Sequence, residues 1–384
     1  MVRGLDTELH GGTEIHREDI FIMQFVPGIE LAHLFYEEAV RPILEKDFPG
    51  LVYSAALLGS GSEVLGFDTE MSTDHSWGPR LFLFLEEGDD EALAEPVRLA
   101  LGNQLPLTFR GFYTHYETTP EEPNTHIPVA TEQRPITHRV VINTLSQFLE
   151  AYTGARLDKG ITLLDWLLTP EQNLRTLTAG GLFHDGLGTV EPLRRQLAWY
   201  PHDVWLYLLS AQWTRIGQEE AFVGRTGIVG DETGSAVLAS RLVRDLMRLC
   251  FLIERQYAPY SKWFGTAFSR LDCAPALTPI FAAVHRSKSW QEREEHLVAA
   301  YEYAAAMHNQ LAITPPIPSK VSYFHDRPFR VIDGGTAAEI IRQSITDEAI
   351  HALPPGIGKV DQYVDNTDVL SHASRCRALG KLYS

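Results

Sequence analysis

The residues best suited to chemistry are a run of glycines and serines that joins two apolar segments of the sequence. The segments, residues 51–58 and 81–85, have the length and composition of buried strands. Glycine has no side chain and tolerates positive φ angles, so the backbone N–H groups around it can approach an anion closely. We therefore expect a phosphate-binding turn after the first strand, formed by Gly59, Ser60, Gly61 and Ser62.

An acid and a histidine precede the second apolar segment. Asp74 is placed to hold a hard divalent cation, Mg²⁺ or Mn²⁺, between its carboxylate and phosphate oxygens. A phosphate-binding turn and a carboxylate are the minimum for metal-assisted nucleotidyl transfer. His75 can ligate a metal or move a proton, or it can pack on Trp77 and shape the start of the strand. Its polar surroundings favour the role in a site.

The second half of the sequence offers a candidate base and several cations. Glu219 and Glu220 lie at a predicted helix end, where a carboxylate can deprotonate an acceptor hydroxyl, although paired surface glutamates are common. Arginines recur every seven residues along another predicted helix and so share one side of it. They are Arg241, Arg248 and Arg255. This row is either a solvated basic edge or a phosphate-binding surface, and we expect Arg241, Arg248 and Lys262 to face a nucleotide.

Two further patterns allow other sites. Residues 180–188 surround His184 and Asp185 with four glycines, which is typical of a binding loop or of an ordinary turn between helices. Together with His138 and Asp245, this pair also follows the order of ligands in HD-type metal phosphohydrolases. His138 begins a predicted strand, however, whereas the metal ligands of that family lie on helices.

Composition narrows the class of protein. The 384 residues are enough for two domains with cores of their own. The formal net charge of -17 argues against binding to nucleic acid, whose affinity comes mainly from Lys and Arg. Three scattered cysteines form neither a disulfide framework nor a zinc pattern. The sequence shows no signal peptide and no apolar run that could span a membrane, so we expect a cytoplasmic protein.

The predicted elements place these residues in an α+β protein, with a small mixed sheet followed by an all-α helical bundle. Residues 1–145 contain a helix over 29–48 kinked at Pro42, a helix over 89–101, and strands over 107–116 and 137–143 besides the two apolar segments. Residues 146–314 carry long helical patterns typical of a bundle. Residues 315–384 mix short apolar pieces with Gly and Pro, and we expect them to pack back on the core.

The segment GSGSEVLGFDTEMSTDHSWGPR resembles the nucleotidyltransferase-like family known as DUF4037. So do GDETGSAVLASRLVRDLMRLCFLIERQYAPYSKWFGTAF and, near the end, DQYVDNTDVL, so the resemblance extends over nearly the whole chain. The family is similar to polymerase-β-type nucleotidyltransferases such as kanamycin nucleotidyltransferase. Their signature is Gly-Ser, a further Gly, and an Asp-x-Asp pair, which Gly61-Ser62, Gly66 and Asp74 match. Ser76 stands where the second carboxylate belongs.

The resemblance implies transfer of an NMP from an NTP, with ATP the expected nucleotide, to a hydroxyl group with Mg²⁺. The acidic charge favours a small-molecule or protein acceptor, and the aminoglycosides are the cationic analogy. Ser76, and the lack of a third acid on residues 107–116 or 137–143, support an alternative. In that alternative the protein is a catalytically degenerate nucleotide-binding or regulatory protein on the same fold.

Overall fold

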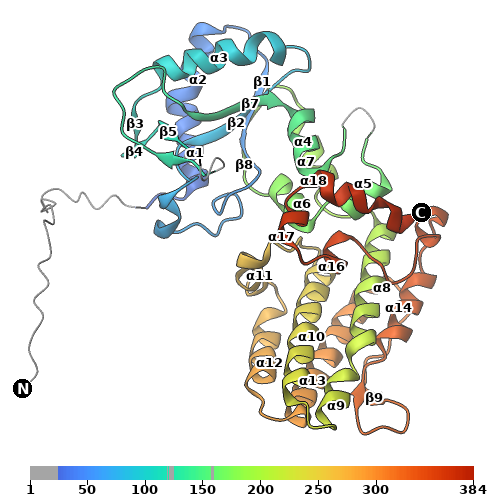
Figure 1. Cartoon of the computed structure of the whole chain (residues 1–384). Helices are drawn as coiled ribbons and strands as arrows, with labels where there is room; N and C mark the ends of the chain where they lie inside the picture. The colour runs from blue at the N-terminus through green and yellow to red at the C-terminus, as the bar shows by residue number, and fades with distance from the viewer. Residues whose placement is uncertain (1–24, 119, 121–124, 157–159) are drawn as a thin grey trace, which may run out of the picture.

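A four-stranded mixed sheet forms the upper part of the molecule and a bundle of helices forms the lower part (Figure 1). The computed structural model describes residues 25–118, 120, 125–156 and 160–384. From their polar composition we expect residues 1–20 to be peripheral, and they lie outside the described residues. The α+β class predicted from the sequence is confirmed.

The sheet has the strand order β7-β2-β1-β8. Its strands are β1 (Tyr53–Leu57), β2 (Arg80–Leu85), β7 (Arg139–Thr144) and β8 (Gly181–Asp185). β1 runs antiparallel to β2 and to β8, whereas β2 and β7 are parallel. Every residue of β1 is buried, as expected for a continuous apolar strand that is covered on both faces. The predictions of strands within residues 51–58, 81–85 and 137–143 are confirmed.

The fourth strand, β8, comes from the glycine-flanked segment that was interpreted as a binding loop or a turn between helices. Its Leu182 pairs with Ala56, and its Asp185 pairs with Ser54. The carboxylate of Asp185 accepts a hydrogen bond of 2.7 Å from the Ser54 hydroxyl, and the backbone N–H of Glu191 donates to it at 3.1 Å. Both interpretations of this segment are therefore wrong. Its polar pair belongs to a strand at the edge of the sheet.

The first helical region was predicted as one helix kinked at Pro42. It is α1 (Gly28–Phe35), a π-helical turn η1 (Tyr36–Val40) and α2 (Arg41–Asp47). Pro42 lies in the first turn of α2. Since proline cannot donate a backbone hydrogen bond, the regular α pattern is interrupted in the turn before it. The regular helix is therefore interrupted next to Pro42, and the interruption takes the form of a π-helical turn.

Helix α3 (Asp90–Gln104) confirms the helix predicted over residues 89–101. The strand predicted over residues 107–116 is wrong. Its central part is a hairpin of two short strands, β3 (Thr108–Phe109) and β4 (Phe112–Tyr113). Arg110 and Gly111 at its tip have φ angles of 50° and 84°, which a tight hairpin turn with two positive φ angles requires. A second pair of short strands follows it, β5 (Tyr116–Glu117) and β6 (Ile127–Pro128).

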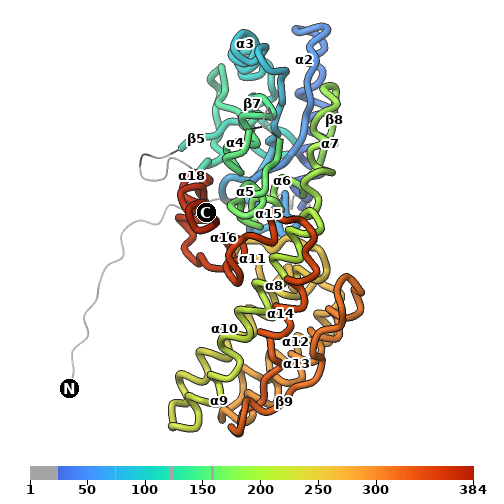
Figure 2. Tube along the Cα trace, turned by 90° about the vertical axis from the view of Figure 1, so that its right-hand side faces the viewer, coloured from blue at the N-terminus to red at the C-terminus, as the bar shows by residue number. Residues whose placement is uncertain are grey.

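The helical part is built around α8 (His202–Glu219), whose side chains are buried on nearly all sides. The other long helices are α10 (Glu232–Ile253), which packs on α8, and α12 (Ala274–Arg286) and α13 (Trp290–Gln310), which pack on α10 and on each other. They confirm the long helical patterns predicted within residues 146–314. Figure 2 shows this bundle extending away from the sheet along the long direction of the molecule. In the described part of the chain, no helix combines the length and apolarity needed to cross a membrane.

Shorter elements connect the two parts and complete the bundle. Between the sheet and α8 lie α4 (Leu145–Thr153), α5 (Leu163–Leu168), α6 (Glu171–Thr178) and α7 (Val190–Gln196). Within the bundle are α9 (Phe222–Gly227) and α11 (Ser261–Phe268). After α13 come β9 (Ser322–Tyr323), β10 (Arg330–Val331), α14 (Gly334–Gln343), α15 (Glu348–His351), α16 (Val360–Tyr363), α17 (Thr367–Leu370), α18 (Ala373–Arg377) and η4 (Ala378–Tyr383).

Helix α14 brings the last part of the chain back onto α8. The two helices meet at glycines: a Cβ atom on Gly217 of α8 would lie 2.7 Å from the backbone nitrogen of Gly335 and 3.0 Å from the carbonyl carbon of Gly334. Backbone atoms cannot swing aside as the end of a flexible side chain can. The close approach of α14 to α8 therefore depends on a glycine at position 217.

We expect the substitution Gly217→Ala to destabilise the protein by about 1–3 kcal/mol, because the added methyl group forces α14 away from α8. The matched control is Gly265→Ala in α11, where an added Cβ meets nothing within 4 Å. There the gain in helix propensity is about 1 kcal/mol or less. Urea unfolding curves of both variants measure the difference. Equal unfolding midpoints would show that the α8–α14 contact is not tight.

Candidate functional site

A cavity of about 720 Å³ lies where the sheet meets the helical part. One wall is the segment after β1, from Ser60 to Glu63, and the opposite wall is the start of α11, with Tyr260 and Lys262. The other lining residues are Leu65, Thr69, Met71, Ser72, His75, Ser76, Trp77, Gln172, Asn173, Thr176, Trp263, Thr367 and Ser371. Segments far apart in the sequence therefore form one cleft.

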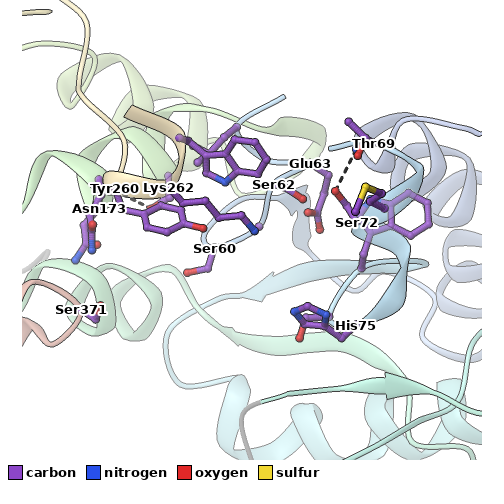
Figure 3. A pocket seen from close by; sticks show the side chains of 18 of the residues that line it. Ser60, Ser62, Glu63, Thr69, Ser72, His75, Asn173, Tyr260, Lys262 and Ser371 are labelled. Carbon is purple, nitrogen blue, oxygen red and sulfur yellow. Dashed lines mark hydrogen bonds between the residues drawn. The ribbon is translucent and has the colours of Figure 1, made fainter. Parts of the chain in front are cut away.

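The cleft brings together several of the residues predicted for a site. Figure 3 shows Lys262 and Tyr260 on one side, Ser60 and Ser62 near the middle, and His75 beyond them. Gly61 also lines the cleft, and Gly59 is buried beside it. Asp74 ends a 3₁₀ helix, η2 (Glu70–Asp74), but its side chain lies outside the described part of the structure. Its role as a metal ligand and catalytic acid remains a prediction.

A buried ion pair supports the glycine-serine segment from below. Arg80, the first residue of β2, donates from Nε to Glu63 Oε1 at 2.7 Å and from Nη2 to the carbonyl oxygen of Ser60 at 2.7 Å. The side chains of Arg80 and Glu63 are only 7% and 3% exposed. Gly61, with φ of +150°, crosses directly over this pair, and a Cβ there would lie 2.6 Å from Glu63 Oε2. The path of the segment therefore requires glycine at this position.

Hydrogen bonds also attach the segment to the helices. The backbone N–H of Gly59 donates to the carbonyl oxygen of Thr176 in α6 at 3.0 Å. The backbone N–H of Ser60 donates at 3.0 Å to the hydroxyl of Tyr152 in α4. Two of the backbone N–H groups in the predicted phosphate-binding turn therefore already have partners within the protein. A phosphate would have to use the amides of Gly61 and Ser62 and the serine hydroxyls.

The acids near the cleft have structural partners. Asp68 accepts hydrogen bonds from the backbone N–H of Gly28 at 2.7 Å and from the Trp77 indole at 3.1 Å, so it fixes the start of α1. Glu63 is held by Arg80. Among the residues that the structure describes, no group of three or more His, Cys, Asp or Glu side chains could hold a metal ion. The described residues thus do not provide a set of ligands for Mg²⁺, and Asp74 remains the only predicted one.

Guanidinium groups, rather than acids, stand side by side at the start of β2 and β7. Arg80 and Arg139 are paired in the parallel register of these strands. Arg139 Nη1 donates at 2.8 Å to the carbonyl oxygen of Ser76, whose φ angle is 53°. Burial, and then the charge of Arg80, lower the pKa of Arg139 to about 10. Arg139 is therefore charged at neutral pH and adds a positive charge behind the cleft.

The wall on α11 combines one cation with aromatic surface. Lys262 is exposed, and its Nζ lies 5.1 Å from the centre of the Trp263 ring. The Trp263 ring in turn stacks on the Phe67 ring, with 5.2 Å between the ring centres. The guanidinium carbon of Arg270 lies 4.2 Å from the centre of the Phe67 ring. This stacking holds the indole in place, with the exposed lysine beside it, opposite the glycine-serine segment.

The other predicted site residues lie elsewhere. Glu219 forms an ion pair of 2.6 Å with Arg241. Glu220 is buried and accepts backbone hydrogen bonds from Ile332 at 2.6 Å and Gly334 at 3.1 Å. Both glutamates are at the C-terminal end of α8, far from the sheet in Figure 1, and neither they nor Arg241 line the cleft. The structure therefore does not bring the predicted base to the cleft.

The residues of the HD-type hypothesis do not share a site. His138 Nε2 is 3.0 Å from the carbonyl oxygen of Arg98, and Asp185 lies in β8. Asp245 is buried in α10 and accepts a hydrogen bond of 3.1 Å from Arg215 Nε. Each of these side chains has its own structural partner, so the described residues do not support a phosphohydrolase centre of this type.

Sequence reasoning missed the polar residues that α6 and α17 contribute. Gln172, Asn173 and Thr176 reach the cleft from α6, and Thr367 and Ser371 reach it from the C-terminal segment. No local pattern marks them, because only the folding of the last residues against α6 places them there.

Comparison with known families gives one match. The family described as "Domain of unknown function (DUF4037)" matches residues 166–264, which extend from α5 to α11 and include Lys262. The chain thus contains a DUF4037 domain, and this part of the predicted resemblance is confirmed. The glycine-serine segment lies outside the matched range. Searches among curated proteins and among solved structures found no match, and no finding ties the domain to nucleotidyltransferases.

We expect Arg80→Met to destabilise the protein by about 3–5 kcal/mol, since it leaves the Glu63 carboxylate buried without its partner. The double variant Glu63→Leu/Arg80→Met should recover much of this loss. The control pair is Glu95 and Arg98, whose side chains are 60% and 53% exposed; there Arg98→Met should change stability by about 1 kcal/mol or less. Chemical unfolding of all variants measures the coupling, and additive effects at Glu63 and Arg80 would contradict it.

The buried Glu220 should make stability depend on pH. Burial raises its pKa from 4.5 to about 7, so between these values the folded protein binds more protons than the unfolded chain. The stability contributed by the protonated Glu220 is fully present below about pH 4.5 and is lost as the pH rises through 7, by roughly 3 kcal/mol. Glu220→Gln should flatten the curve of unfolding free energy against pH over this interval. A curve parallel to that of the wild type would contradict the expectation.

Proposed function

We propose that the cleft binds a nucleoside triphosphate and that the protein transfers its NMP group to a hydroxyl of a small-molecule or protein acceptor. The observation that carries the proposal is the position of Lys262 and Tyr260 across the cavity from Ser60, Gly61 and Ser62. The cavity has a volume of about 720 Å³, which is within the range of clefts that bind ligands of this size.

Charge supports a phosphate on the glycine-serine side. The chain as a whole carries a formal net charge of -17, yet Lys262 faces the cleft and Arg139 adds a charge behind it. Serine hydroxyls and backbone N–H groups of residues 61 and 62 are neutral donors that suit phosphate oxygens. The cleft therefore offers an anion a favourable local field within an acidic protein.

Aromatic side chains support a base at the other end of the nucleotide. Tyr260 and Trp263 line the cleft beside Lys262, and the highly exposed Met71 lines it from η2. Flat aromatic rings and a flexible thioether are common partners of a nucleobase, because stacking requires only a π face. We assign the base to this side of the cleft.

In the proposed reaction, the acceptor oxygen attacks the α-phosphorus and forms a new P–O bond. The bond from the α-phosphorus to the bridging oxygen breaks, and its electron pair leaves with pyrophosphate. His75, which lines the cleft, is the candidate to take the hydroxyl proton. If Mg²⁺ is bound with the nucleotide, it would neutralise part of the phosphate charge. Asp74 is the residue of this chain proposed to bind it.

The same fold also suits a nucleotide-binding protein without transfer activity. This second candidate is favoured by Arg80 and Arg139 at the entrances of β2 and β7, and by Ser76 at the place of the second acid. In such a protein Lys262 and the glycine-serine segment would hold the nucleotide, Arg80 and Arg139 would add positive charge behind them, and the acids needed for transfer would be missing.

Isothermal titration with ATP and Mg²⁺ tests the binding shared by both candidates. We expect saturable binding that Lys262→Ala weakens by about tenfold, because a charge-assisted contact with phosphate is lost. The control is Lys288→Ala, an exposed lysine that precedes α13 and does not line the cleft. Absence of binding to the wild type, or an equal loss in both variants, would refute the proposal.

A pyrophosphate-release assay with a panel of hydroxyl compounds separates transfer from binding alone. If the protein is a transferase, we expect release that depends on an acceptor and that falls by at least a hundredfold in Asp74→Asn, as metal binding is weakened. Binding of ATP with no release for any acceptor would favour the non-catalytic candidate.

A further inference from the structure

A second hollow of about 270 Å³ adjoins the cleft. The two share Gln172, Tyr260 and Thr367 as lining residues, so they lie side by side. The second hollow is also lined by Glu171 and by Arg248 of α10, the arginine that was predicted to face the nucleotide. Arg248 is thus beside the cleft rather than in it.

Arg248 is a largely buried cation with an incomplete set of partners. Its side chain is 13% exposed, and the nearest approach to the Glu171 carboxylate is 3.9 Å, from Nη1 to Oε2. Its Nε is buried, with no hydrogen-bond partner among the described residues. The ring of Phe264 lies 5.7 Å from its guanidinium carbon. A buried charge of this kind is unfavourable unless another group pairs with it.

The other cations around the hollow have close partners. Lys359 Nζ lies 3.2 Å from Asp361 Oδ2 and donates to the Tyr200 hydroxyl at 2.8 Å. Arg244 forms a two-point ion pair with Asp365. Within each ion pair, the opposite charges neutralise each other.

Glu171 is a weak partner for Arg248. It accepts from the Tyr200 hydroxyl and from the backbone N–H of Ala258 at 3.4 Å each, both long hydrogen bonds. Burial also raises the pKa of its carboxyl group, which reduces the negative charge that it offers to Arg248.

We propose that this second hollow binds a forked oxyanion, a carboxylate or a phosphate group, of the acceptor substrate, with the terminal N–H groups of Arg248 as its main donors. A planar guanidinium matches two oxygens of such a group. The proposal rests on the proposed function, and it makes the acceptor an anionic small molecule. The acidic charge of the chain suggested a cationic acceptor instead, but Arg248, a guanidinium group of this hollow without a close carboxylate, favours the opposite.

The adjacent positions of the two hollows explain how such an acceptor would be placed. With its anionic group beside Arg248, the rest of the molecule would pass Gln172 and Tyr260 into the cleft. Its hydroxyl would then lie near the proposed triphosphate. Holding both reactants in adjoining hollows makes the attack effectively intramolecular.

The test is isothermal titration of the full chain with inorganic phosphate and, separately, with acetate at constant ionic strength. Each is measured with and without saturating ATP and Mg²⁺. We expect at least one of the anions to bind, and Arg248→Met to weaken its binding by about tenfold or more. Arg248→Lys keeps the charge without the planar fork and should show an intermediate loss.

The matched control is Arg241→Met, one heptad earlier on the same helix and 55% exposed, which should bind as the wild type does. Binding of neither anion to the wild type, or equal binding to Arg248→Met, overturns the proposal. Displacement of the anion by ATP also overturns it, because Arg248 would then belong to the nucleotide site. If the anion binds through Arg248 but ATP does not bind at all, the nucleotide function fails while an oxyanion site at Arg248 stands.

Discussion

The arrangement of the cleft depends on the buried ion pair between Arg80 and Glu63. The pair joins the first residue of β2 to the turn after β1, and Arg80 also holds the carbonyl oxygen of Ser60. Its members are both charged and almost fully enclosed, so neither can move without leaving the other uncompensated. This constraint fixes where Gly61 and Ser62 face the cavity, and it engages the Glu63 carboxylate, which is therefore not available to a metal ion.

The cleft exists because the sheet and the helices are assembled together. β8 lies between α6 and α7 in the chain and pairs with β1. In α6, the carbonyl oxygen of Thr176 accepts a hydrogen bond from the backbone N–H of Gly59. The C-terminal segment then closes one side with Thr367 and Ser371. Since the walls come from such distant segments, their relative positions depend on these few contacts. A change in the packing of β8 would therefore alter the relative positions of the cleft walls.

Charge is distributed unevenly in this acidic protein. Lys262, Arg139 and Arg248 lie in or beside the adjoining hollows, and among the described residues the nearest acids either have close partners or, like Glu171, are held at a distance. The first two favour the proposal of a bound nucleotide, and the third favours the proposal of an anionic acceptor. Two anionic groups bound in adjoining hollows would need such cations. The net charge of the whole chain, which concerns solubility and long-range attraction, does not reveal this local balance.

The sequence by itself determined the strands within residues 51–58 and 81–85 and most long helices, because apolar periodicity and glycine or proline breaks are read from neighbouring residues. It also identified Ser60, Gly61, Ser62, His75 and Lys262, all of which line one cleft. Tertiary structure alone decided that residues 181–185 form a strand and that Asp68 and Glu220 accept backbone N–H groups. It also decided that Arg248 opens on a second hollow. The partners of these residues lie tens to more than a hundred positions away, and no local pattern encodes such distant contacts.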